Sequence, residues 1–253
     1  LSFRPKDSDW TLSASVKLGR ARRNGEVSKS IPYATQYKGL SNNNESHTLI
    51  DFQVGKDVGL GMTGVDSVIS GGIRMADLRS RKDVHISSGF PIGFPNFATN
   101  KPDSTIAHRF RGVGPSMAWD ATATIAGAPD SGKLGIDWGV NAALLIGRQT
   151  VKQTIDGYYR HVARFYSGYS TNKKLIAHTV HATPIRQRKA VVPDLGAYAA
   201  ISYRFPNAKV SLGYRADWFF NAQDGGLAST QLVNRGFFGP FAGISIGVSP
   251  SDF

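Results

Sequence analysis

The 253-residue sequence contains no cysteine, which excludes disulfide bonds as a source of stability. It has no apolar run near the roughly 18 residues of a membrane-spanning helix, so a helical membrane protein is excluded. The opening LSFRPKDSDW lacks a basic segment followed by an apolar one, and we expect that the signal peptide of an exported precursor has already been removed. Acidic residues are few: 18 Asp and Glu face 30 Lys and Arg, a net charge of +12 that favours an anionic partner.

The stretch KLGIDWGVNAALLIGR, residues 133–148, shows a strict period of two. One face carries only apolar side chains, and the other carries mostly glycine, Asp137 and Asn141. A period of two indicates a β-strand, and this stretch exceeds the about 9–11 residues that a tilted strand needs to cross a bilayer. It is therefore typical of a transmembrane strand with one lipid-facing and one polar face.

Seven further segments alternate in the same way: 10–19, 47–61, 67–78, 112–127, 195–205, 209–220 and 239–248. The connections between the eight segments are alternately long and short. This alternation is typical of outer-membrane barrels, which have tight periplasmic turns and long outer loops. We expect an all-β chain, with residues 1–253 forming one eight-stranded, antiparallel, up-and-down transmembrane β-barrel; the segment 67–78 is the least regular.

Aromatic residues gather near the ends of these segments, where interfacial girdles are expected. They are Trp10, Tyr203, Phe205, Trp218, Phe219, Phe220, Phe237 and Phe238. A terminal aromatic residue, here Phe253, is found in many outer-membrane barrels as an assembly signal.

The whole chain resembles the small eight-stranded outer-membrane barrels of the OmpA and OmpX kind through this pattern. The segments GYRADWFFNA and GPFAGISIG also resemble the C-terminal hairpin of the Legionella major-outer-membrane-protein-like pore-forming family. The first resemblance implies a structural barrel in a bacterial outer membrane, and the second implies a pore.

Charged residues on the polar faces of the segments would fill the barrel interior. They are Lys17, Asp51, Asp57, Arg74, Asp120, Asp137, Arg204, Arg215 and Asp217. An isolated ion in a narrow interior is costly, so we expect a network of ion pairs. An eight-stranded barrel is only wide enough for its side chains to fill it, which favours a closed interior over a narrow anion-preferring channel.

The excess positive charge lies in the three expected outer loops, residues 20–46, 79–111 and 148–194, with net charges of +3, +4 and +7. Their candidate binding residues are Arg22, Arg23, Arg79, Arg81, Lys82, Arg160, Arg164, Lys173, Lys174, Arg186, Arg188 and Lys189. Lys and Arg are natural partners of phosphate. We expect them to contact lipopolysaccharide or another envelope protein rather than nucleic acid, although plain solvation of loop charges is the alternative.

Several short motifs match known functional patterns only in part and do not indicate a function. GAPDSGK, residues 127–133, matches the G-x-x-x-x-G-K pattern of a phosphate-binding loop, but Leu134 stands where a Ser or Thr is needed. GLGMTG, residues 59–64, matches the G-x-G-x-x-G pattern of dinucleotide-binding proteins, but no helix is expected after it. His178 and His181 are expected to be loop residues, and we predict no metal site and no cofactor. His108 and serines 87–88 could act as a lipid A-modifying pair, but no spacing requires it, and we expect no enzymatic activity.

Overall fold

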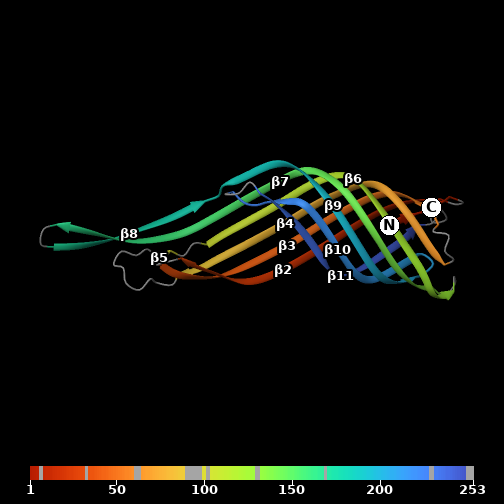
Figure 1. Cartoon of the computed structure of the whole chain (residues 1–253), viewed down its shortest axis with the longest axis horizontal. Coiled ribbons are helices and arrows are strands. Elements are labelled where there is room, and N and C mark those ends of the chain that lie inside the picture. Colours follow the sequence, from red (N-terminus) through yellow and green to blue (C-terminus); the bar gives the residue numbers. More distant parts are fainter. Residues whose placement is uncertain are drawn as a thin grey trace.

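The computed structural model describes residues 1–5, 8–31, 34–59, 64–88, 99–100, 103–128, 132–167, 170–227 and 231–248; within these, side chains are described except at 26–31, 34–39, 86–88, 99–100, 103, 128, 157–167, 170–180 and 248. The described part is all-β (Figure 1). Its strands are β1 (Ser2–Phe3), β2 (Trp10–Ile31), β3 (Ala34–Asp57), β4 (Val65–Ser88), β5 (Thr99–Asn100), β6 (Asp103–Ala128), β7 (Gly132–Ser167), β8 (Ser170–Ala182), β9 (Ile185–Arg204), β10 (Ala208–Asp224) and β11 (Leu232–Val248).

The strands form a ring of hydrogen-bonded neighbours. The order is β7, β6, β4, β3, β2, β1, β11, β10 and β9, and a pairing between β9 and β7 completes the circle. Neighbouring strands are antiparallel except for β1, which lies parallel to β11. β5 and β8 pair with the far part of β7, outside this circle.

The alternation in β7 sets which residues face outward. Ile136, Val140 and Leu144 are 42%, 47% and 46% exposed on the outer face, whereas Asp137 and Asn141 are buried in the interior. The same alternation continues in β9 and β10. The ring is therefore apolar outside and partly polar inside, the reverse of a water-soluble domain.

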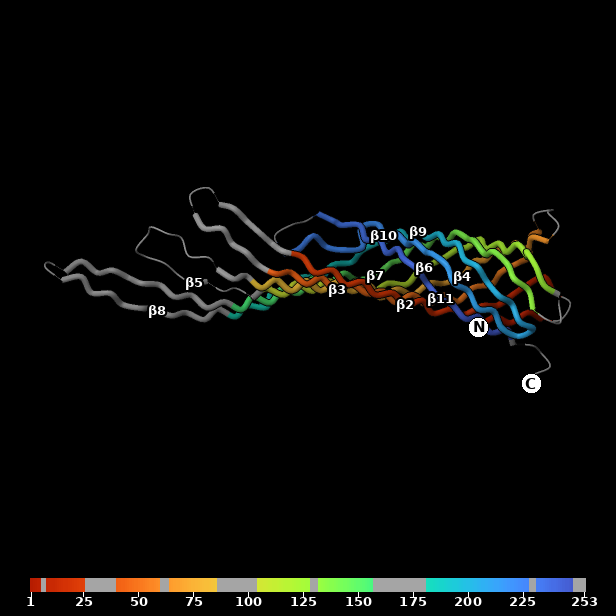
Figure 2. The backbone as a smooth tube through the Cα atoms, turned by 90° about the horizontal axis from the view of Figure 1, so that it is seen from below, coloured from red at the N-terminus to blue at the C-terminus, as the bar shows by residue number. Residues whose placement is uncertain are grey.

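The segments expected to be long loops are largely strands. β2 and β3 remain paired as far as Ile31 and Ala34, and β4 and β6 as far as His85 and Asp103. β7 continues to Ser167, and its far part pairs with the antiparallel β8 (Figure 1). Figure 2 shows the strands of the ring from a perpendicular direction. The hydrophobic pattern detects a strand only where one face is apolar, whereas backbone hydrogen bonding continues where both faces are polar.

Three strands have no counterpart among the eight expected segments: β1 precedes the first segment, and β5 and β8 lie within expected loops. Each of the other strands covers one segment, although β3 ends at Asp57 and β9 at Arg204, before the expected ends at 61 and 205. The described residues include no helix that is long and apolar enough to span a membrane.

Candidate functional site: the interior of the ring and its basic outer surface

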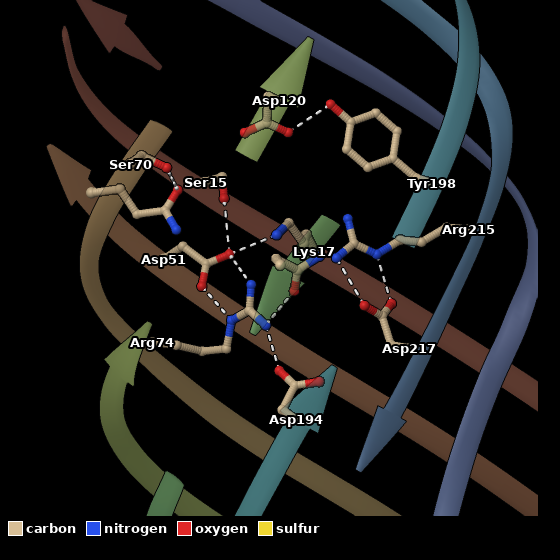
Figure 3. Close-up of polar contacts among 12 residues, drawn as sticks. Ser15, Lys17, Asp51, Ser70, Arg74, Asp120, Asp194, Tyr198, Arg215 and Asp217 are labelled. Atoms are coloured by element: carbon tan, nitrogen blue, oxygen red, sulfur yellow. Dashed lines mark hydrogen bonds and ion pairs between the residues drawn. The ribbon is translucent and has the colours of Figure 1, made fainter. Parts of the chain in front are cut away.

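Arg74 of β4 lies at the centre of an interior network. Its side chain is fully buried, and its Nε donates to Asp51 Oδ1 at 2.6 Å. Its Nη1 donates to Asn141 Oδ1 at 2.7 Å and also to Asp194 (Figure 3). One guanidinium therefore joins β3, β7 and β9 across the ring, using the fork of donors that suits arginine to several oxygen acceptors.

Two further cations complete this interior network. Lys17 Nζ lies 2.7 Å from Asp51 Oδ2, and Arg215 donates to both oxygens of Asp217 at 2.6 and 2.8 Å (Figure 3). Gly196 lies so close to Asp217 and Asn141 that a side chain there would overlap both. The network has three cations and three carboxylates, so its charges balance without a bound ion.

A second polar cluster lies towards the β9–β10 turn. Asp137 accepts from Thr122 Oγ1 at 2.8 Å and pairs with Lys209 at 2.9 Å. Asp120 accepts from the Tyr198 hydroxyl at 2.7 Å (Figure 3). The contacts of Lys209 with Asp137 and of Tyr198 with Asp120 link strands that are not sequence neighbours, and together the three contacts satisfy two carboxylates inside the ring.

An apolar layer closes the interior beyond the network. Its side chains come from β3, β4, β6, β7, β9 and β10, and each is at most 5% exposed; they are Leu49, Leu78, Phe110, Leu145, Val192 and Phe219. Phe237 of β11 packs against them, with its ring 6.0 Å from that of Phe219. The prediction that Phe219 and Phe237 belong to the aromatic girdle is wrong. Side chains alternate along a strand, so these two point into the interior while their sequence neighbours point outward.

A third polar cluster lies on the far side of the apolar layer. Arg235 is 3.1 Å from Glu45, and Arg186 and Arg188 both pair with the buried Asp224. Gln149 accepts from Arg188 at 2.8 Å. The interior thus has ionic contacts on both sides of a hydrophobic constriction.

The charged residues expected in the interior fall into two groups. Lys17, Asp51, Arg74, Asp120, Asp137, Arg215 and Asp217 take part in the interior contacts above. Asp57 and Arg204 instead pair near the ends of strands, with Arg4 at 3.5 Å and with Asp66 at 3.4 Å.

Sequence reasoning missed Asp194, Lys209 and Asp224 as interior residues. Asp194 was assigned to a loop, although it stands one position before Leu195 and therefore has the parity of the polar face. Extending the alternation backwards along that strand would have found it, together with Arg186 and Arg188, which the same parity turns inward.

The other expected loop cations lie on strands. Arg22 and Arg23 belong to β2, Arg79, Arg81 and Lys82 to β4, and Lys189 to β9. The side chains of Arg160, Arg164, Lys173, Lys174 and His178 lie outside the described residues. His181 contacts Asp156, and no group of three or more metal-ligating side chains occurs within the described ranges.

Asp77 organises three arginines on the outer surface of β4 and β6. It accepts from Arg79 at 2.9 Å, from Arg109 at 2.6 Å and from Arg111 at 3.3 Å. Arg79 and Arg109 each contact both oxygens of Asp77 through Nε and Nη2. The three guanidinium groups are therefore held together around one carboxylate.

A strand follows each of the two motifs that match nucleotide-binding loops, residues 127–133 and 59–64, whose central residues lie outside the described part. β7 begins at Gly132, so a strand follows GAPDSGK, and Gly127 and Gly132 adopt φ of 113° and 102°. Gly59 and Gly64 of the other motif also have positive φ, and β4 begins directly afterwards at Val65. Among the described residues, the chain after each motif is a strand and not the helix N-terminus that phosphate loops use.

No protein-family model matches the chain, and no curated protein matches it significantly.

Proposed function

We propose that the chain is an eight-stranded transmembrane β-barrel of a bacterial outer membrane, with a structural and interaction role. Its partners in this proposal are outer-membrane lipid and lipopolysaccharide. The observation that carries the proposal is the inverted distribution of side chains: apolar residues are exposed around the ring, while Arg74, Asp51 and Asp194 are buried and paired. A hydrocarbon solvent favours this arrangement, and water does not.

The closed interior supports a structural role over conduction. The apolar layer includes Phe110, Leu145 and Phe219, none more than 1% exposed, and it follows the balanced interior network. A path for ions would have to cross both layers. The small OmpA- and OmpX-like barrels to which the sequence pattern is similar fit this proposal.

Two measurements test the proposal in sequence. The purified full chain should require detergent to remain in solution, and a freely soluble monomer would contradict membrane insertion. In planar bilayers the inserted protein should show no single-channel steps, because the interior is filled. Resolved, reproducible steps would overturn the structural role in favour of a porin-like narrow channel.

A further inference from the structure

Three consecutive rows of cross-strand neighbours on the outer face are rich in Lys and Arg. Each row contains three cations; their members are Leu18, Thr48, Asp77, Arg111, Arg148 and Lys189, then Arg20, Ser46, Arg79, Arg109, Thr150 and Gln187, then Arg22, Asn44, Arg81, Ala107, Lys152 and Ile185. We call these the basic rows. They hold nine cations and the single carboxylate of Asp77, and Asp83 of the adjacent row pairs with Arg81.

The row next to them towards the β1 end of the ring is entirely apolar. It consists of Val16, Ile50, Met75, Val113, Ile146 and Val191. Five of these side chains are exposed on the same outer face, between 46% and 64%. Successive rows are two residues apart, about 7 Å along a strand, so the surface changes from apolar to basic within one step.

Most of the cations are available to a ligand. Arg111 uses only Nε to contact Asp77, and its side chain is 64% exposed. Within the described part of the chain, Arg20, Arg22, Lys152 and Lys189 have no carboxylate partner. A groove of about 620 Å³ runs over this surface, lined among others by Arg20, Arg79, Arg109 and Lys152.

We propose that the basic rows bind the phosphate groups of a phosphorylated, acylated glycolipid, the lipid A portion of lipopolysaccharide in the outer leaflet. This inference rests on the proposed membrane insertion and assigns the partner to strand residues rather than to loops. The occupant follows from charge and position together: several guanidinium groups match phosphate oxygens bidentately, and the adjacent apolar row would meet the acyl chains of the same molecule. Free phosphate would use only the first of these features.

The experiment compares lipid binding by the detergent-solubilised full chain and by two charge-matched double variants. Arg109→Gln with Arg111→Gln removes two cations of the basic rows. Arg4→Gln with Lys56→Gln removes two cations near Trp10, beyond the opposite edge of the apolar surface. The probes are bisphosphorylated lipid A, dephosphorylated lipid A and inorganic phosphate, and the measurement is the dissociation constant.

We expect the basic-row variant to bind bisphosphorylated lipid A about ten-fold more weakly, since charged hydrogen bonds are lost. The control variant should bind like the wild type, dephosphorylated lipid A should bind weakly to all three proteins, and inorganic phosphate should not displace the lipid at millimolar concentration. Equal affinity of the basic-row variant, an equal loss in the control, or displacement by inorganic phosphate would each overturn the site.

A separate measurement distinguishes failure of this site from failure of membrane insertion. Brominated phosphatidylcholine vesicles without lipid A should quench the outward-facing Trp10 and Trp218, which are 51% and 44% exposed. Quenching with unchanged lipid A affinity in the basic-row variant would reject only the site. Absence of quenching would reject the proposed barrel and the site with it.

Discussion

At the scale of single residues, Arg74 balances the negative charge of the interior carboxylates. It is shared by Asp51, Asp194 and Asn141, and both carboxylates are almost fully buried. Asp51 retains Lys17 as a second cation, but Asp194 has no other ion-pair partner in the described part of the chain. Removing Arg74 therefore leaves one buried carboxylate without a cation. This costs more folding free energy than replacing the whole ion pair by apolar residues.

We predict that Arg74→Leu lowers the free energy of unfolding by about 3–5 kcal/mol, because breaking a buried pair leaves a charge uncompensated. The matched variant Arg74→Leu with Asp194→Leu keeps the Lys17–Asp51 pair and should recover most of that loss. Denaturant unfolding in detergent micelles measures both. Equal destabilisation by the single and double variants would show that the unpaired Asp194 is not the cause of the lost stability.

At the scale of strands, β7 joins two different environments on one outer face. Val140 lies within the apolar region, whereas Thr150 lies in a basic row between Arg109 of β6 and Gln187 of β9. Both side chains point away from the interior, so the two positions differ in their level along the strand rather than in orientation. Under the proposed membrane insertion, the strand therefore offers an internal comparison of a lipid-facing position with a water-facing one.

We predict that Val140→Arg destabilises the membrane-inserted protein by about 2–4 kcal/mol, the cost of a charge at the lipid-facing midplane of a barrel. Thr150→Arg should cost little, because that position lies among solvated cations. Folding into phosphatidylcholine vesicles, followed by urea titration, gives both values. If the two variants lose the same stability, the boundary between the apolar and basic rows is misplaced.

The sequence predicts these strands best where their two faces differ in polarity. Val140 and Asp137 differ clearly, and the structure gives them the expected exposed and buried positions. Leu145 and Phe219 lie on interior faces that the pattern treats as polar or interfacial, so the apolar layer was not predicted. Strand extensions such as that containing Arg22 were missed for the opposite reason, since both faces are polar there and only backbone pairing maintains the strand.

At the scale of the whole molecule, the closure between β2 and β11 differs from every other junction of the ring. No described residue of β2 pairs directly with β11; the two-residue β1 lies between them. Side chains of β11 and β3 also contact each other at this junction. Arg235 of β11 pairs with Glu45 of β3, and the Phe237 ring lies 4.4 Å from the ring of His47. β3 and β11 thus contact each other across the inner surface of β2.

Gly19 of β2 makes this crossing possible, because a side chain at that position would overlap the His47 ring. We predict that Gly19→Ala displaces His47 from Phe237 and destabilises the protein by about 1–3 kcal/mol, the usual cost of overpacking. Gly239→Ala of β11, where an added Cβ would meet no other atom within 4 Å, is the control and should cost less than about 1 kcal/mol. Denaturant unfolding in micelles compares them, and protease cleavage within β2 should increase only in Gly19→Ala. An unchanged unfolding midpoint and cleavage rate in that variant would mean that backbone pairing through β1 alone holds the ring closed.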